Sequence, residues 1–243
     1  VGDLSAVVTG LLLAYNLPPT IPLWMAAVGA FVAIVIVKQL FGGIGQNFAN
    51  PAITARIVLM VSFPAAMTTW LAPNAGTYGA VTTATPLSLI SSGDLSQLPT
   101  AWEMFIGIRG GCIGETSAVF LLLGGLYLMG RRVISPTVPA AFVGTVALLS
   151  FLLGRDPLYA VLSGGLLLGA IFMATDYTTS PLTRRGKIIF AVGCGVITTL
   201  IRVYASLPEG VSYSILLMNI LTPLIERFTA PKPFGRERVK HEK

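Results

Sequence analysis

Long apolar stretches constrain this chain more than any other feature. About eight of them reach or approach the roughly 20 mostly apolar residues that a helix needs to cross a bilayer. They are residues 4–16, 22–40, 50–72, 113–130, 137–153, 157–175, 187–205 and 211–228. Charged residues form only 11% of the chain, whereas a soluble domain carries about a quarter. The sequence therefore predicts an all-α polytopic membrane protein, with residues 1–243 as a single transmembrane domain.

Two parts of the sequence resemble each other. Thr9-Gly10-Leu11-Leu12-Leu13 lies in the first apolar stretch, and Gly164-Gly165-Leu166-Leu167-Leu168 lies in the sixth. Stretches that are five apart cross a membrane in opposite directions, which is the pattern of an inverted-topology repeat. Because the chain begins at Val1 in the middle of the apolar pattern, we expect that N-terminal helices are missing. Two of them would complete an inverted-repeat bundle of five-plus-five helices.

The basic residues indicate an orientation. The net charge is +6, and Lys and Arg gather at the ends of apolar stretches: Arg131-Arg132, Arg184-Arg185-Lys187 and residues 227–243. Cytoplasmic loops collect Lys and Arg. We therefore expect a cytoplasmic C-terminus with a basic tail at 229–243, which includes the single histidine, His241, and we expect the loop that holds Lys38 to lie inside. Nucleic acid is not an expected partner, since a nucleic-acid site would gather the charge on one face.

The same orientation places residues 73–112 outside, as an outer loop. About thirteen of the sixteen basic residues then lie inside by the positive-inside rule. Those left at the outer side are Arg109, Arg155 and Arg202.

A polar interruption at residues 42–51 breaks one apolar region. It contains Gly45, Asn47 and Asn50 and ends in Pro51, which is well placed to open a helix. Non-helical backbone at membrane depth needs protein or a cavity to satisfy it. The residues fit two alternatives: a polar re-entrant turn with ordinary caps, or two amides presented toward one ligand.

Glu115 and Asp176 are carboxylates in apolar surroundings. An intramembrane carboxylate is costly and is a functional candidate by default, so both are candidates for an ion path. Both also lie at segment ends, where Glu115 could serve a helix N-terminus and Asp176 could order the turn at 176–183.

The two cysteines predict no metal site. Cys112 and Cys194 lie far apart without metal-ligand spacing. We expect both to be small apolar space-fillers.

The loop at residues 73–99 is rich in Pro, Gly, Ser, Thr and Ala. In one interpretation it is a turn whose hydroxyls satisfy nearby backbone groups. In the other, Thr85 carries a phosphoester, with small neighbours at Thr83 and Ala84 and a helix beginning near Pro86 to favour the anion.

Several blocks of the sequence resemble one known family, the membrane protein shared by the Rnf complex (its D subunit) and the sodium-pumping NADH:quinone reductase (its B subunit). Val81-Thr82-Thr83-Ala84-Thr85-Pro86-Leu87 resembles the flavinylation sequence of this family. The further blocks that resemble it are Gly42-Gly43-Ile44-Gly45-Gln46-Asn47, Asn50-Pro51-Ala52, Gly114-Glu115-Thr116-Ser117 and Phe172-Met173-Ala174-Thr175-Asp176-Tyr177. The continuation through Pro181 is closer to the Rnf protein.

The resemblance implies a covalent FMN on Thr85, with Thr82 and Thr83 as the alternatives. Gly79 and Thr83 depart from the family's flavinylation pattern. It also implies a second, non-covalent riboflavin near Asn47 and Asn50.

By this resemblance the chain is an electron-carrying subunit of an ion-translocating ferredoxin:NAD oxidoreductase in the cytoplasmic membrane of a bacterium or archaeon. Its partners would be the other membrane, flavin and iron–sulfur subunits and the lipid bilayer, and sodium ions or protons would move outward. The sequence shows no catalytic residues of its own. Two other classes remain open, a urea- or ammonium-like channel or transporter and a structural anchor for soluble partners.

Overall fold

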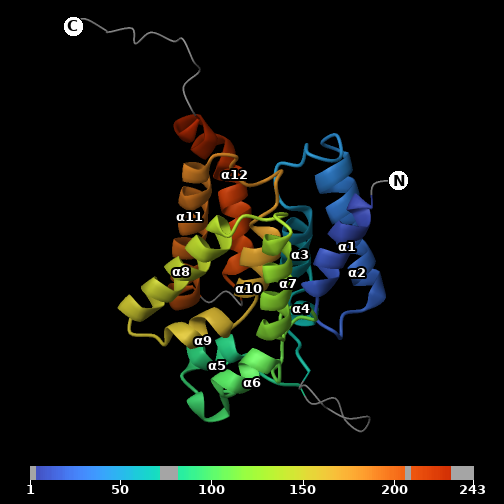
Figure 1. The fold of residues 1–243 in the computed structure, drawn as a ribbon. Coiled ribbons are helices and arrows are strands. Elements are labelled where there is room, and N and C mark those ends of the chain that lie inside the picture. The colour runs from blue at the N-terminus through green and yellow to red at the C-terminus, as the bar shows by residue number, and fades with distance from the viewer. Residues whose placement is uncertain (1–3, 72–81, 206–208, 231–243) are drawn as a thin grey trace, which may run out of the picture.

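The computed structural model describes residues 4–71, 82–205 and 209–230 (Figure 1). Within these ranges the chain is helical and contains no strand; Leu71 and Thr82 form an isolated antiparallel bridge. The all-α prediction is therefore confirmed for the described residues. The expectations for Gly79 and Val81, for most of the basic tail and for His241 lie outside them.

The helices follow the predicted apolar stretches closely in most places. In chain order they are α1 (Ser5–Tyr15), α2 (Leu23–Phe31), η1 (Val32–Gln39), α3 (Pro51–Ser62), α4 (Pro64–Met67), α5 (Pro86–Ser92), η2 (Leu95–Gln97), α6 (Ala101–Ile106), α7 (Ala118–Gly130), α8 (Thr137–Leu152), α9 (Pro157–Leu162), α10 (Leu166–Leu168), η3 (Gly169–Met173), α11 (Arg184–Tyr204) and α12 (Val211–Thr229). The segments η1 and η3 are π-helical, and η2 is a 3₁₀ turn.

Two of the apolar stretches are not single helices, which corrects the prediction. The stretch 50–72 gives α3 and then α4, because Pro64 has no N–H to continue the ladder of α3. The stretch 157–175 breaks between α9 and α10, where Gly164 adopts a φ of 60° that other residues rarely tolerate. Among the described residues, α11 alone is long and apolar enough to cross a membrane by length and composition; α1, α2 with η1, α3, α7 and α8 are shorter apolar helices.

The prediction of an inverted repeat is not tested by these helices. Thr9–Leu13 lie within α1, whereas Gly164–Leu168 span the break before α10. The two similar sequences thus occupy different local structures, and the repeat stays a prediction.

Local cap chemistry sets where several helices begin. α3, α5 and α9 each start at a proline, which loses nothing at the first helical position. The residue before each proline caps the helix with its side-chain oxygen. These caps are Asn50, Thr85 and Asp156.

The helices pack as one bundle. α11 packs against α8 and α12, and α12 packs against α3, which lies beside α1 and η1 (Figure 1). The core between them includes Phe142, Phe190 and Ile215, all fully buried. Small residues allow close approach: a Cβ on Gly195 of α11 would lie 2.6 Å from Cβ of Thr145 on α8. Such small-residue contacts are typical of helix interfaces in membranes.

The bundle has two distinct ends (Figure 1). α5, α6 and α9 gather at one end, and α12 finishes at the other. At the first end Thr100 caps α6 in a reciprocal pair with Glu103, and these backbone and side-chain hydrogen bonds hold the pKa of Glu103 below its ordinary value.

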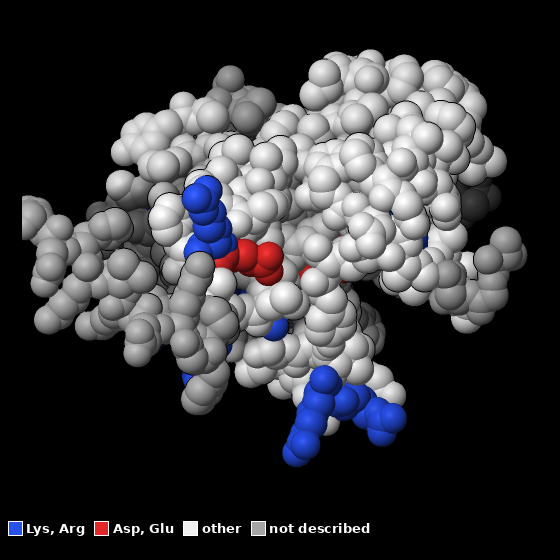
Figure 2. Space-filling view, turned by 90° about the horizontal axis from the view of Figure 1, so that it is seen from above, with Lys and Arg blue, Asp and Glu red and all other residues white. Residues whose placement is uncertain are grey.

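Seen from the end at which α12 finishes, the molecule shows a few basic side chains, one of them next to an acidic side chain, on a largely uncharged face (Figure 2). Arg131 and Arg132 follow α7, and Arg184 and Arg185 open α11; all four are exposed. Lys38 differs from the prediction, because it lies in the last turn of η1 rather than in a loop. Its side chain is buried and donates to Thr9 Oγ1.

Candidate functional site at the α5 end

Residues 82–85, which hold the three candidate threonines, are held by backbone contacts before α5 begins. Thr82 forms a bridge with Leu71, and Thr83 N donates to Trp70 O at 3.0 Å. Gly110 lies against the same segment, since a Cβ there would be 2.6 Å from Cγ2 of Thr83. The segment is therefore held between the chain after α4 and the chain before α7.

Thr85 is the N-cap of α5. Its Oγ1 accepts from Ser88 N at 3.2 Å and donates to Ser88 Oγ at 3.2 Å. Thr82 is exposed, whereas Thr83 and Thr85 are half-buried and line a cavity together with Ala84. Two of the three candidate threonines, Thr83 and Thr85, therefore line this cavity, and Thr82 does not.

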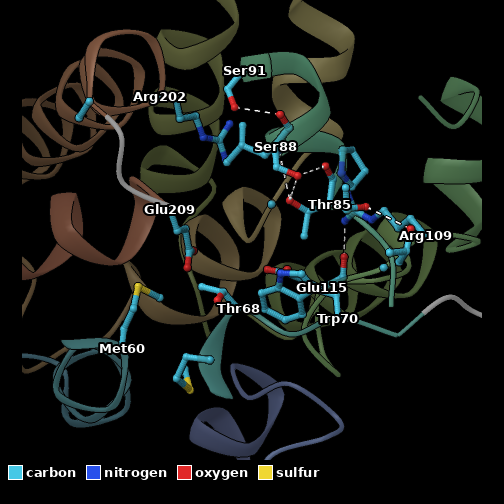
Figure 3. Close-up of a pocket in the computed structure, with 18 of the residues that line it drawn as sticks. Met60, Thr68, Trp70, Thr85, Ser88, Ser91, Arg109, Glu115, Arg202 and Glu209 are labelled. Atoms are coloured by element: carbon cyan, nitrogen blue, oxygen red, sulfur yellow. Dashed lines mark hydrogen bonds between the residues drawn. The ribbon is translucent and has the colours of Figure 1, made fainter. Parts of the chain in front are cut away.

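This cavity, which we call the threonine cavity, has a volume of about 620 Å³. Figure 3 shows Thr85 and Arg109 on one side of it and Arg202 and Glu209 on the other. Its walls come from segments far apart in the sequence: α3, the end of α4 and the chain after it, α5 and the segment before it, the residues before α7, the α8–α9 connection, the break between α9 and α10, and the end of α11 with the chain that leads to α12. Folding therefore creates this site from most of the chain.

Six charged side chains line the wall, and positive charge is in excess. The arginines are Arg56, Arg109, Arg155 and Arg202, and the carboxylates are Glu115 and Glu209. Four positive and two negative groups give a formal charge of +2. The three arginines that the charge pattern placed at the outer side are thus all at this cavity, and so is Arg56, which the same count placed inside.

Two of the arginines are held in place by backbone carbonyls. Arg109 donates from Nε to Thr116 O at 3.0 Å, and its other nitrogens reach the carbonyls of Leu162 and Glu115. Arg202 donates to Ala160 O at 2.7 Å and to Ser163 O at 3.0 Å. Neither guanidinium is neutralised by these contacts, so both keep their charge in the cavity wall.

A buried ion pair joins α3 to the start of α12. Arg56, 2% exposed, pairs with Glu209, 5% exposed, and also donates to Asn16 Oδ1. Arg56 Nη2 lies 3.4 Å from Cys112 Sγ, which in turn donates to Asn16 O at 3.2 Å. Cys112 is buried as predicted, but it also takes part in this polar network; Cys194 lies buried between α11 and α12.

Glu115 completes the network. Its Oε1 accepts from Cys112 N at 3.1 Å, so it does not cap α7, whose N-cap is Ser117. Its Oε2 and the Oε1 of Glu209 both lie within 3.0 Å of the position that a Cβ on Gly165 would take. Two buried carboxylates therefore converge where the break between α9 and α10 provides a glycine.

Several buried polar atoms around the threonine cavity have no hydrogen-bond partner within the described residues. The donors are Arg56 Nε and Arg202 Nε, and the carboxylate acceptors are Glu115 Oε2 and Glu209 Oε1. An unpaired buried polar group costs about 1–3 kcal/mol. Such groups persist in native proteins where water or a ligand supplies the partner.

The predicted residues of the 42–51 interruption lie elsewhere. Asn50 is engaged as the cap of α3: its Oδ1 accepts from Ala52 N and Ile53 N, and its Nδ2 donates to Met173 O at 3.4 Å. With its amide oriented to satisfy both partners, Asn219 accepts from Asn50 N.

Asn47 connects this turn to the segment after η3. Its Nδ2 donates to Ala49 O at 3.0 Å and to Thr178 Oγ1 at 3.1 Å. Gly45 adopts a φ of 81° with open space around it. These residues do not line the threonine cavity.

Asp176 organises the turn that follows η3. It accepts from Thr178 N and from the hydroxyls of Thr178 and Thr179. Asp176 and Glu115 are therefore not brought together, and only Glu115 reaches the threonine cavity.

Sequence reasoning missed Arg56 and Glu209. Each is a single charge in or next to an apolar stretch, and the two have opposite signs. A search for charges of both signs in apolar stretches would have found the pair, since such residues pair with one another inside a bilayer.

These features define a class: a helical bundle with a charged, threonine-lined cavity at one end. The NQR2, RnfD, RnfE family matches residues 1–235 of the chain. The chain belongs to this family, and the resemblance seen in the sequence motifs is confirmed at that level.

Curated relatives cover nearly the whole chain. It is 53% identical to the D subunit of the Na(+)-translocating ferredoxin:NAD(+) oxidoreductase complex of Acetobacterium woodii, over 100% of this chain and 76% of that protein. The D subunit of the proton-translocating ferredoxin:NAD(+) oxidoreductase complex of Clostridium ljungdahlii is 49% identical, over 97% and 76%. The D subunit of the ion-translocating oxidoreductase complex of Stutzerimonas stutzeri is 42% identical, over 96% and 76%.

Proposed function

We propose that this chain is the membrane electron-transfer subunit of an ion-translocating ferredoxin:NAD oxidoreductase and carries a covalent FMN on Thr85. The names of its relatives support the complex. The cofactor rests on the motif around Thr85 and on the chemistry of the threonine cavity.

One observation carries the cofactor proposal: the Thr85 hydroxyl lies in a cavity wall with an excess of two positive charges. A phosphodiester on this hydroxyl would bring a negative charge into partly buried surroundings, where an unpaired charge is costly. Three of the wall arginines, Arg109, Arg155 and Arg202, have no described carboxylate at salt-bridge distance. Their positive charges would offset that of the phosphodiester.

The residues present fit the group in a second respect. Arg56 Nε and Arg202 Nε are buried donors without partners in the described part of the chain, and phosphate oxygens accept readily from guanidinium groups. FMN would supply one-electron redox chemistry when bound. The chain's own part is to tether the group, balance its charge and hold it in one place.

For the arrangement in the membrane we propose a five-plus-five inverted repeat in the cytoplasmic membrane of a bacterium or archaeon. Residues 73–112 and the threonine cavity would face outward, and residues 229–243 would be cytoplasmic. The placing of exposed arginines beyond α7 and at the start of α11 supports this orientation by the positive-inside rule. Many large apolar side chains on the outer faces of α7 and α8 are exposed, which suits contact with lipid.

The proposed partners are the other membrane subunits and the flavin and iron–sulfur subunits of the same complex. The chain would act within that complex rather than as an enzyme alone. Ferredoxin would deliver electrons to other subunits, and the flavin on Thr85 would relay them one at a time.

A second, non-covalent riboflavin at Gly45, Asn47 and Asn50 stays a prediction. The Asn50 side chain is used within the fold on both its oxygen and its nitrogen, so Asn47 is the residue with more freedom to bind. Acid extraction of free riboflavin from the complex would test it: Asn47→Ala should lower the extracted amount, and an unchanged amount would exclude Asn47.

The test of the covalent flavin is denaturing gel fluorescence together with the intact mass of the protein. Wild-type protein should fluoresce in the gel and carry the added mass of FMN on a peptide that contains Thr85. Thr85→Ala should remove both signals, and Thr82→Ala, a matched change on the exposed threonine, should keep them. An unmodified mass in natively produced wild-type protein would overturn the proposal and favour a channel or transporter.

A further inference from the structure

A second cavity adjoins the threonine cavity. It has a volume of about 410 Å³ and lies between α5, the α8–α9 connection, α9 and α11; we call it the α9 cavity. The two cavities share four lining residues: Leu87, Arg155, Arg202 and Val203. The two cavities therefore meet at these four residues.

We infer that the α9 cavity binds a planar heteroaromatic ring, the isoalloxazine of the flavin whose phosphate is esterified to Thr85. This inference rests on the proposed function and adds the place of the ring and the residues that surround it. Leu87 follows Thr85 by two positions on α5 and lines both cavities. The first turn of α5 thus leads from the attachment point to the α9 cavity.

The walls of the two cavities differ in the way that the two ends of a flavin differ. The threonine cavity has six charged side chains in its wall, which suits a phosphate and a polyhydroxyl chain. The α9 cavity has three, Arg155, Asp156 and Arg202. Its other walls are mostly apolar, with the hydroxyls of Ser150, Tyr159 and Thr199. An apolar cavity with a few polar groups is the usual site for a ring with apolar faces and a polar edge.

The one carboxylate of the α9 cavity is already engaged. Asp156 caps α9, accepting from Leu158 N at 2.8 Å and from Tyr159 N at 3.4 Å. It therefore does not neutralise Arg202, whose Nη1 and Nη2 go to backbone carbonyls and whose Nε is buried without a partner in the described chain. A positive charge remains at the junction of the cavities.

Arg202 is then a positioning residue with an electrostatic effect on the ring. A fixed cation beside a flavin stabilises the reduced, more negative ring and raises its reduction potential. The positive charge of Arg202 would thus favour electron arrival at the flavin on Thr85.

The first experiment measures how well iodide quenches the flavin fluorescence of the intact, purified complex. The signal of this flavin is the difference between wild-type complex and complex that carries Thr85→Ala, because other flavins cancel in the difference. The ring should be shielded from iodide in the native complex and exposed after denaturation. Quenching that is equally strong in native and denatured complex would overturn the inference without the need for any cavity variant.

The second experiment fills the α9 cavity. Ala160→Leu places a larger side chain in its wall, and Ala140→Leu makes the same change at an exposed position of α8 that lines neither cavity. Ala160→Leu should keep the denaturing gel fluorescence, because Thr85 is untouched, but should raise iodide quenching and shift the flavin absorption. Ala140→Leu should match wild type. Retained covalent flavin with unchanged quenching and absorption in Ala160→Leu would overturn the inference.

A third measurement tests Arg202 through the midpoint potential of the same flavin. Arg202→Gln should lower the potential, and Arg202→Lys should restore part of it, which a merely structural role would not predict. An unchanged potential in a folded Arg202→Gln complex would overturn the electrostatic part.

Native mass spectra that show a lipid lost on Ala160→Leu, with no change in the flavin, would instead assign the α9 cavity to a lipid chain. An unmodified mass of wild-type protein would overturn the proposed covalent flavin itself. Failure of the proposed function can therefore be told apart from failure of the ring site in the α9 cavity.

Discussion

Two polar clusters lie among the apolar helices of this molecule, and they differ in their hydrogen bonding. At the threonine cavity, Glu115, Glu209, Arg56 and Arg202 all leave buried atoms without partners among the described residues. The cluster at the start of α3 and after η3 leaves none on Asn47, Asn50 or Asp176. The first cluster leaves buried polar atoms for something outside the fold, whereas in the second the side chains of Asn50 and Asp176 bond within the fold and Asn47 bonds through its amide nitrogen.

This difference separates binding from structure better than residue type does. Asn47, Asn50 and Asp176 have the side chains of a binding site, but their contacts are turns and caps. At the threonine cavity the unpaired atoms come with an excess of positive charge. Since each unpaired buried group costs about 1–3 kcal/mol, the cluster indicates a ligand or bound water.

The largest expected effect comes from breaking the Arg56–Glu209 pair. Either Arg56→Met or Glu209→Gln removes one charge of a buried pair and leaves the other uncompensated. The cost of such a change is about 3–5 kcal/mol. The midpoint of thermal unfolding of the purified protein in detergent should fall clearly for each single variant.

The double variant is the control for this pair. Because it removes both charges together, its loss should be smaller than the sum of the two single losses, as for residues in direct contact. Additive losses would show that the two side chains act independently and that the pair is not a unit.

The second prediction concerns the point where the two carboxylates converge. Gly165→Ala would place a methyl group 2.9 Å from Glu115 Oε2 and 3.0 Å from Glu209 Oε1. Overpacking of this kind costs about 1–3 kcal/mol. Thermal unfolding should show the loss, and flavin content should fall if the carboxylates shape the cavity.

Gly144→Ala is the matched control, since a Cβ at this exposed position of α8 meets nothing within 4 Å. It should be neutral or stabilising by about 0.5–1 kcal/mol, because alanine is the better helix former. Equal losses in the two variants would show that the convergence on Gly165 has no special role.

The third prediction belongs to the other cluster. Asn50→Ala removes the cap of α3 and should cost about 1 kcal/mol, within the usual range for a lost N-cap. Asn50→Asp keeps the cap oxygen and loses only the donor to Met173 O, so it should cost less. The proposed flavin on Thr85 should be unaffected in both, and its loss would contradict the separation of the two clusters.

The sequence predicted local features well. The cap at Asn50-Pro51 and the helix that begins at Pro86 depend on neighbouring residues, so the pattern was sufficient. Counting crossings predicted that Arg109, Arg155 and Arg202 lie on one side of the membrane, and the structure brings all three to one cavity.

The pairing of Arg56 with Glu209 could not be read in the same way. It depends on α3 packing against α12, which no local pattern specifies. The break at Gly164 was missed because the apolar pattern continues through it, and the full structural role of Asn50 was missed because its partners include Met173 from a distant segment. The sequence shows which residues are polar and which of them cap helices locally. The packing of distant helices decides which polar atoms remain without a hydrogen-bond partner.

The smallest expected effect is that of Asp176→Asn, because both carboxylate oxygens of Asp176 already accept hydrogen bonds within its own turn. Asparagine keeps one acceptor oxygen for Thr178 and Thr179, so stability should change by less than about 0.5 kcal/mol, as for most substitutions away from special features. Ion transport by the complex in proteoliposomes should be close to normal.

Glu115→Gln is the contrasting variant, because it neutralises a buried carboxylate with an unpaired oxygen in the cavity, and it should slow transport or alter flavin binding. If Asp176→Asn stops transport while Glu115→Gln does not, complete hydrogen bonding does not mark a structural role and the ion path lies at the Asp176 turn. Normal transport in both would place the path outside these two carboxylates, while the threonine cavity would keep its assignment as the flavin site.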